Sequence, residues 1–77
     1  GESDAAIDFD SLCQLLRRLG FDMRIKGSHH IFRKEGIEEK INLQKDKKNA
    51  KPYQVRQVRN LIQKYDLESN DKWTNTK

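Results

Sequence analysis

The 77-residue sequence has little cysteine, proline and aromatic content, and it contains no long apolar run. Its single cysteine, Cys13, has no partner for an intramolecular disulfide. The longest apolar runs are two or three residues, whereas a helix needs roughly 20 to span a bilayer. A secretory pattern, a basic segment followed by an apolar one, is also missing from the first residues. These absences exclude a disulfide-stapled or membrane-spanning scaffold, and we expect a cytoplasmic protein.

A chain of this length forms one small domain, which buries only about 60% of the surface that its unfolded form exposes. We expect this domain to occupy residues 9–67, where the apolar residues recur periodically. Residues 1–8 read as a flexible N-terminal segment. Residues 68–77 are polar and non-periodic apart from Trp73, and they read as a flexible C-terminal tail.

Charge is unevenly distributed along the chain. The net charge is +4, but residues 1–10 contain four acids and no base, whereas residues 11–65 contain 14 Lys and Arg against 5 Asp and Glu. Such a basic folded unit favours a polyanionic partner, because Lys and Arg release counterions when they contact phosphates. Nucleic acid is therefore the first candidate ligand, and a merely solvated basic surface is the alternative.

Two segments have the periodicity of amphipathic helices. In residues 9–20 the apolar side chains recur at steps of three and four, so Cys13 is expected in the core rather than as a reactive thiol. Asp8 or Asp10 can cap this helix, and Gly20 can end it. The second helix begins at Pro52. Its apolar stripe consists of Val55, Val58, Leu61, Ile62 and Tyr65.

Between the helices the apolar period changes to two, which is typical of strands. Residues 21–26 form the first strand, with Phe21, Met23 and Ile25 on its buried face. Gly27-Ser28 suits a type II′ hairpin turn. The second strand runs from His29 to about residue 34, and residues 40–43 form the third. The sequence thus predicts an α+β fold of order α-β-β-β-α, with both helices on one face of a three-stranded antiparallel sheet.

The two histidines are adjacent and must therefore point to opposite faces of the sheet. Phe32 is the natural core residue of its strand, so His30 is expected to face the helices and His29 the open face. Arg24, Lys26, Lys40 and Asn42 are the expected neighbours of His29. An accessible imidazole among cations suits acid-base chemistry on a phosphodiester, whereas a solvated polar residue is the alternative.

Three stretches, "LLRRLGF", "KGSHHIFRK" and "VRQVRNLIQKYDL", resemble the HicA family of toxins from bacterial toxin-antitoxin modules, over roughly residues 9–67. The resemblance implies a fold like a double-stranded-RNA-binding domain. It also implies an mRNA interferase, a metal-independent endoribonuclease that needs no cofactor and that a cognate HicB-type antitoxin inhibits. The histidine after Gly-Ser is the catalytic one in that family, which makes His29 the expected catalytic residue.

The expected RNA-binding residues are basic, apart from one serine in the hairpin turn. They are Arg24, Lys26, Ser28, Lys40, Lys45, Lys47, Lys48 and Lys51. No metal site is expected, because no acidic or cysteine cluster accompanies the histidines. The free protein is expected to be a monomer. A non-catalytic RNA-binding module, using the lysines of residues 45–51 with Arg56 and Arg59, and a pure protein-interaction domain are the alternatives.

The sequence also departs from the family pattern. Many members end the third strand with a His-Pro pair, whereas this chain has Leu43-Gln44-Lys45. A second histidine on the open face is therefore missing as an acid for the leaving 5′-oxygen, and water or a lysine must supply that proton. We expect a slow enzyme, in which His29 is the general base and Lys26, Lys40 or Lys45 stabilises charge on the phosphorane.

Overall fold

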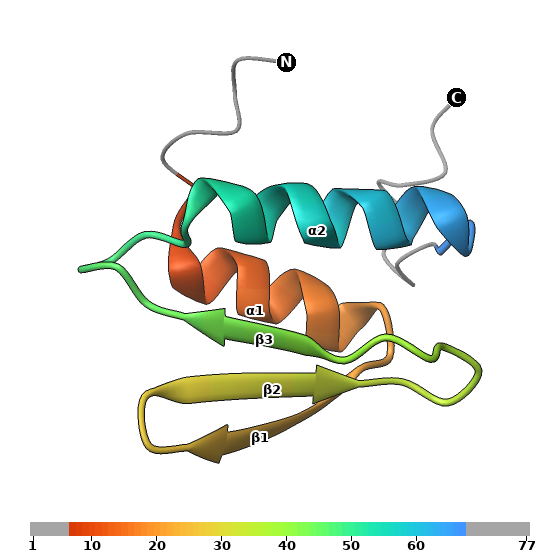
Figure 1. The fold of residues 1–77 in the computed structure, drawn as a ribbon, viewed down its shortest axis with the longest axis horizontal. Helices are drawn as coiled ribbons and strands as arrows, with labels where there is room; N and C mark the ends of the chain where they lie inside the picture. Colours follow the sequence, from red (N-terminus) through yellow and green to blue (C-terminus); the bar gives the residue numbers. More distant parts are fainter. Residues whose placement is uncertain (1–6, 68–77) are drawn as a thin grey trace.

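The computed structural model describes residues 7–67, so the predicted C-terminal tail with Trp73 and most of the predicted N-terminal segment lie outside the described residues. The elements follow one another in the predicted order (Figure 1). They are α1 (Phe9–Arg18), β1 (Asp22–Lys26), β2 (His29–Arg33), β3 (Ile41–Gln44) and α2 (Pro52–Lys64). Within residues 7–67, no helix has the length and apolar character required to cross a membrane.

Neighbouring residues determine where helix α1 begins and ends. Asp8 is the N-cap, and its carboxylate accepts a hydrogen bond from the Ser11 N–H at 3.0 Å. At the other end Gly20 adopts φ +99°, and the Phe21 N–H donates to the Leu16 carbonyl at 3.0 Å. This left-handed glycine turns the chain from α1 into β1.

The three strands form an antiparallel sheet of order β1-β2-β3. Lys26 pairs with His29 across the two-residue Gly27-Ser28 turn. Gly27 has φ +60°, while Ser28 is not among the described non-glycine residues with positive φ, which is the pattern of a type II′ turn. The turn fixes the register of β1 and β2, so Phe32 pairs with Met23. On its other side Phe32 pairs with Ile41 of β3.

Both helices cover the same face of the sheet (Figure 1). From the sheet, Phe32, Ile41 and Leu43 are each 0% exposed, and they join apolar residues of both helices in a single core cluster. The helical members are Phe9, Leu12, Leu16, Val55, Val58 and Leu61. Burial of these side chains is the main force that holds the layers together.

One core assignment from the sequence is wrong. Ile25 alternates correctly with its neighbours and lies on the helix-facing side of β1, yet it is 58% exposed. Strand β1 is the edge strand farthest from α2 (Figure 1), and the helices do not extend over its far end. Met23, two residues earlier, still packs partly against the core. Period-two alternation therefore predicted the correct face for Ile25, but it did not predict how much of β1 the helices cover.

Hydrogen bonds between loops and helix ends complete the domain at two places. The Ala50 N–H donates to the Ile7 carbonyl at 2.8 Å, and the Phe9 N–H donates to the Lys48 carbonyl at 3.0 Å. These bonds join Ile7 and the start of α1 to residues 48–50. At the other end, Glu39 accepts hydrogen bonds from Lys64 Nζ at 2.7 Å and the Tyr65 hydroxyl at 2.6 Å, which fixes the β2–β3 loop to the end of α2.

Candidate active site on the open face of the sheet

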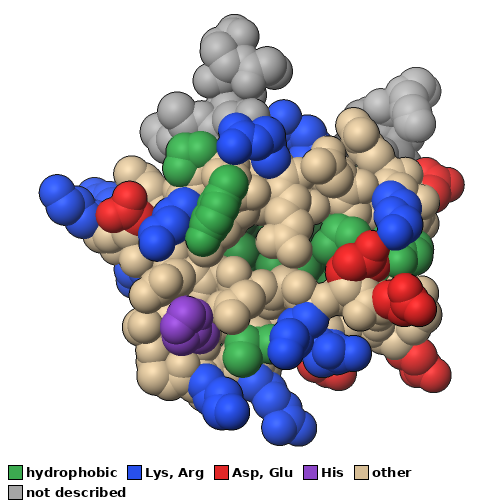
Figure 2. All heavy atoms as spheres, viewed as in Figure 1, with side chains coloured by type: hydrophobic (Ala, Val, Ile, Leu, Met, Phe, Trp, Pro, Cys, Tyr) green, Lys and Arg blue, Asp and Glu red, His purple; other side chains and the backbone are tan. Residues whose placement is uncertain are grey.

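The face of the sheet that the helices leave uncovered carries His29. The strand register puts Lys26 directly opposite His29 on β1 and Gln44 directly opposite on β3. Arg24, Ile31 and Asn42 follow two residues along on the same face. Figure 2 shows a histidine (purple) with Lys and Arg side chains (blue) beside it, while most visible acidic side chains (red) lie toward the other end. The strand register therefore gives His29 cationic neighbours on β1.

A neighbour on β3 fixes one nitrogen of the His29 ring. Nδ1 of His29 lies 3.0 Å from Oδ1 of Asn42. An amide oxygen only accepts hydrogen bonds, so His29 donates its Nδ1–H and the other nitrogen, Nε2, is the one available to a ligand. The sequence predicted Asn42 as a neighbour, and the structure confirms the contact.

His29 opens onto a shallow cleft of about 180 Å³ between the sheet and the beginning of α2. The cleft is lined by His29, Asn42, Gln44, Tyr53 and Gln54. Strands β2 and β3 supply the first three residues, and the first turn of α2 supplies the other two. Because every lining residue carries a polar group, the cleft suits a hydrogen-bonding ligand rather than an apolar one.

Both glutamines of the cleft are held by neighbouring groups. Nε2 of Gln44 donates to the Ser28 hydroxyl at 3.2 Å, so the hairpin turn orients the side chain of Gln44. Oε1 of Gln54 accepts from the Lys51 N–H at 3.3 Å, and Gln54 is only 3% exposed. The walls of the cleft are therefore fixed before any ligand arrives.

The predicted RNA-binding cations do not all gather around His29. Arg24 and Lys26 share its face, and Lys40 is exposed just before β3. Lys45, in contrast, reaches to the helix side, where its Nζ lies 5.6 Å from the centre of the Phe9 ring. Lys51 is the N-cap residue of α2, adjacent to the cleft.

Lys47 and Lys48 occupy the tip of a tight turn. The N–H of Asp46 donates to the Asn49 carbonyl at 2.8 Å, and the N–H of Asn49 donates back to the Asp46 carbonyl at 3.0 Å. Asn49 also bridges to Asp8 beside α1. The lysine-rich segment of residues 45–51 therefore contains an anchored turn that projects two exposed lysines.

His30 points to the helix side, as predicted. Its ring meets the Phe9 ring edge-on, with centroids 4.9 Å apart and an interplanar angle of 84°. Its Nδ1 is buried and has no hydrogen-bond partner among the described residues. These contacts indicate a packing role for His30 and an accessible role for His29.

Cys13 is confirmed as a packing residue. It lies half-buried against the core. Burial, reinforced by the negative charge of Asp10, raises the pKa of its thiol from 9.0 to about 11. The thiol therefore stays protonated near neutral pH, and a protonated thiol is a poor nucleophile.

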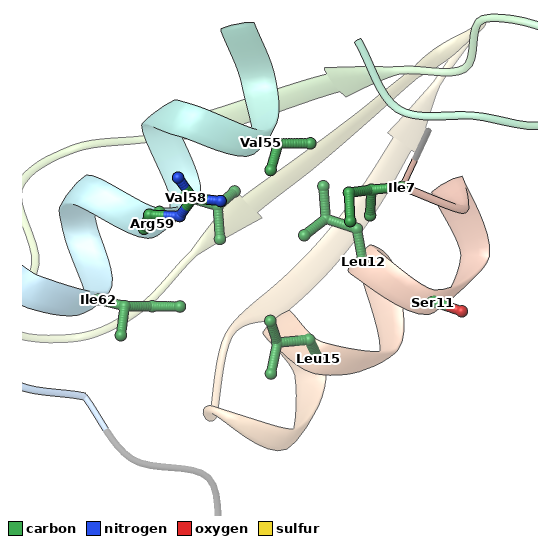
Figure 3. Close-up of a pocket in the computed structure, with 8 residues that line it drawn as sticks. All are labelled: Ile7, Ser11, Leu12, Leu15, Val55, Val58, Arg59 and Ile62. Atoms are coloured by element: carbon green, nitrogen blue, oxygen red, sulfur yellow. The ribbon is translucent and has the colours of Figure 1, made fainter. Parts of the chain in front are cut away.

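A second hollow lies on the opposite side of the molecule, between the two helices (Figure 3). Its volume is about 260 Å³, and its walls are mainly the aliphatic side chains of Ile7, Leu12, Leu15, Val55, Val58 and Ile62. Ser11 and Arg59 are its only polar lining residues among those described. The groove brings no acid-base pair together, so the cleft beside His29 remains the candidate site.

The described residues contain no group of three His, Cys, Asp or Glu side chains close enough to hold a metal ion. Sequence reasoning identified His29 and Asn42 but missed Gln44, Tyr53 and Gln54. Continued alternation along β3 after Asn42 would have indicated Gln44. Nothing local indicated Tyr53 or Gln54, because the distance from β3 to α2 is set by the tertiary fold.

These features define the class of the protein: a small α-β-β-β-α domain with one accessible histidine on the basic, open face of its sheet. A family model described as "HicA toxin of bacterial toxin-antitoxin" matches residues 9–64. The chain therefore belongs to the HicA toxin family, whose systems pair a toxin with an antitoxin. Comparison with curated proteins and with solved structures gives no match.

Proposed function

We propose that this protein is the toxin of its module and that it cleaves mRNA as a metal-independent endoribonuclease, with His29 as the catalytic residue. The single observation that carries the proposal is the exposed imidazole whose Nδ1 is hydrogen-bonded to Asn42 and whose other nitrogen opens onto a polar cleft. Family membership supports the toxin role.

RNA supplies its own nucleophile, the 2′-hydroxyl. Nε2 of His29 removes the proton from this hydroxyl, the 2′-oxygen forms a bond to phosphorus, and the bond from phosphorus to the 5′-oxygen breaks. The products are a cyclic 2′,3′-phosphate and a 5′-oxygen that must gain a proton. General base catalysis of this kind contributes about 10²- to 10⁴-fold.

Cations around His29 supply the remaining assistance. Lys26 is directly opposite His29 on β1, Lys40 immediately precedes β3, and Lys51 is the N-cap of α2. Their charges favour the phosphorane, which carries more negative charge than the diester. The leaving 5′-oxygen takes its proton from water or a lysine, and we therefore expect slow turnover.

The test uses adjacent histidines as a matched pair. Labelled single-stranded RNA is incubated in EDTA with wild type, His29→Ala and His30→Ala, and circular dichroism verifies that each protein is folded. Loss of cleavage in His29→Ala alone is the expected result, because only His29 faces the cleft. His30→Ala should have a lower melting temperature through loss of the Phe9 contact, yet keep its cleavage rate while folded. Binding without cleavage in all three proteins would instead indicate a non-catalytic RNA-binding module.

Inhibition by the antitoxin follows from the same surface. Residues 11–65 have a net charge of +9, so we propose an acidic HicB-type partner that covers the His29 face and competes with RNA. Opposite charges accelerate the encounter, and the rate of association should fall with added salt. A toxin-antitoxin complex that binds and cleaves RNA as well as the free toxin does would contradict occlusion of His29.

A further inference from the structure

Tyr53 is the most exposed aromatic side chain in the described part of the chain. Its exposed fraction is 54%, and the only other large apolar side chain of comparable exposure among residues 7–67 is Ile25 at 58%. Ile25 is exposed because the helices do not cover the far edge of β1. Tyr53, in contrast, lines the same cleft as His29.

Gln44 and Gln54, which line the cleft with Tyr53, each keep one amide atom for a further hydrogen bond. Gln44 uses its Nε2 on Ser28, which leaves its Oε1 as an acceptor. Gln54 uses its Oε1 on the Lys51 N–H, which leaves its Nε2 as a donor. An acceptor and a donor thus lie beside an exposed aromatic ring, each fixed by a neighbouring contact.

We propose that Tyr53, Gln44 and Gln54 form a subsite for one unpaired nucleobase of the RNA, next to the phosphate that His29 attacks. This inference rests on the proposed function for the identity of the nucleic acid. Proteins that recognise single-stranded RNA stack splayed bases on aromatic rings and hydrogen-bond their edges. Tyr53 supplies the stacking surface, and the two amides contact the edge of the base.

The position of the subsite determines the form of RNA that can bind. The cleft has one wall on β3 and the other on the first turn of α2, and it is about 180 Å³ in volume. A base must leave its helical stack to enter a space of that size. Single-stranded RNA therefore gains the Tyr53 contact, whereas a duplex contacts only the surrounding lysines.

Binding is measured in a His29→Ala background, so that the RNA stays intact whatever the outcome for cleavage. A short labelled single-stranded RNA and a duplex of the same length are titrated with this protein and with versions that add Tyr53→Ala, Tyr53→Phe or Ile25→Ala. Ile25→Ala is the matched control, because it also removes a large exposed side chain. Fluorescence polarisation gives the dissociation constants.

Tyr53→Ala should weaken binding of the single strand roughly 5- to 150-fold, the range for loss of one stacked base, and leave duplex binding unchanged. Tyr53→Phe should retain most of the affinity, and Ile25→Ala all of it. The slope of affinity against salt should be the same with and without Tyr53, because stacking releases no counterions.

A single-stranded RNA with one abasic position provides the second arm. When the missing base is the one that Tyr53 contacts, its removal should lose at least the factor that Tyr53→Ala loses, because the amide contacts are lost with the base. Tyr53→Ala should then cause no further loss on the abasic RNA. Equal affinity of Tyr53→Ala and Ile25→Ala for the single strand, or equal losses on single strand and duplex, would overturn the subsite. Failure of wild type to cleave RNA would overturn the proposed function, yet it would leave these binding results interpretable.

Discussion

Two neighbouring residues of the same type serve opposite purposes in this domain because of the strand on which they lie. His29 faces solvent and hydrogen-bonds Asn42, whereas His30 packs against the Phe9 ring. The Nδ1 of His30 is buried and has no hydrogen-bond partner among the described residues. A strand alternates its side chains between faces. Insertion or deletion of one residue in the Gly27-Ser28 turn would exchange the two environments.

The contact between His29 and Asn42 predicts a dependence on pH. Asn42→Ala removes the acceptor that holds the imidazole. By analogy with residues that orient the histidine ligands of a metal, kcat/KM should fall on the order of 10-fold. Asn42→Asp keeps an acceptor of the same shape and should retain activity. Its carboxylate also stabilises the protonated imidazole, so the acid limb of the pH-rate profile should move to higher pH.

Other groups that face the His29 ring also contribute to the pH-rate profile. Lys26 from β1, with Arg24 beyond it, and Tyr53 from α2 face the same site, and none of them changes in either variant. Single-turnover cleavage rates, measured from about pH 5 to about pH 9, provide the test. Equal profiles for wild type and Asn42→Asp would show that Asn42 does not position His29.

At the scale of elements, the turn between β3 and α2 combines strain with charge. Lys47 adopts φ +60°, a conformation that favours glycine and costs other residues on the order of 1 to 3 kcal/mol. Hydrogen bonds between Asp46 and Asn49 hold the turn closed.

Lys47→Gly should therefore stabilise the fold by about 1 kcal/mol, since glycine accepts a positive φ without a steric penalty. It should also weaken RNA binding, because the basic surface loses one cation that can contact a phosphate. Lys48→Gly is the matched control: the same charge is lost from the same turn, but φ is not positive there, so stability should not rise. Urea denaturation and RNA titration measure the two effects, and a stability gain in Lys48→Gly alone would contradict the prediction.

The contact between the β2–β3 loop and the end of α2 predicts how stability changes with pH. Hydrogen bonds from Lys64 and then Tyr65 lower the pKa of Glu39 from 4.5 to about 2. A carboxylate with a depressed pKa stabilises the folded state above its unfolded pKa, and this contribution is lost as the pH falls through the folded value. Glu39 should thus stabilise the domain at neutral pH but not near pH 2.

Glu39→Gln should lower the melting temperature slightly at neutral pH, and its difference from wild type should shrink as the pH is lowered from 4.5 to about 2. The exposed neighbour Glu38 provides the control, because Glu38→Gln changes the charge equally. Thermal melts followed by circular dichroism at several pH values make the comparison. A Glu39→Gln difference that is constant across this range would mean that the ion pair does not contribute to stability.

For the whole molecule, stability rests on a thin core. Phe32 and Leu16 are 0% and 1% exposed, and they come from the two layers that the core joins. Truncating such a side chain leaves a cavity and costs on the order of 2 to 5 kcal/mol. The total stability of a domain of this size is about 5 kcal/mol.

Phe32→Ala and Leu16→Ala should each unfold the domain or nearly so. Ile25→Ala also removes a large apolar side chain from the sheet face that carries Phe32, but at an exposed position, and it should change little. Thermal melting of the three variants tests this difference. A melting temperature of Phe32→Ala within a few degrees of wild type would mean that the helices do not cover the face that carries Phe32.

The sequence by itself determined the element order and the faces of the strands. Apolar periods of 3.6 and 2 specify helices and strands locally, and Gly20 and Gly27 mark the positions where the chain must adopt positive φ. Alternation along β2 is equally local, and it places His29 and His30 on the faces that they occupy. The predicted proximity of His29 to Asn42 also followed, because hairpin register is a local property.

Only the tertiary structure decided how far the helices reach and what they bring to the site. Ile25 is exposed because α1 and α2 leave the far edge of β1 uncovered, and Lys45 reaches the Phe9 ring instead of His29. Tyr53 and Gln54 join the cleft through the packing of α2 beside β3. These placements depend on contacts between segments distant in sequence, which no local period encodes, because the packing of the whole core sets them.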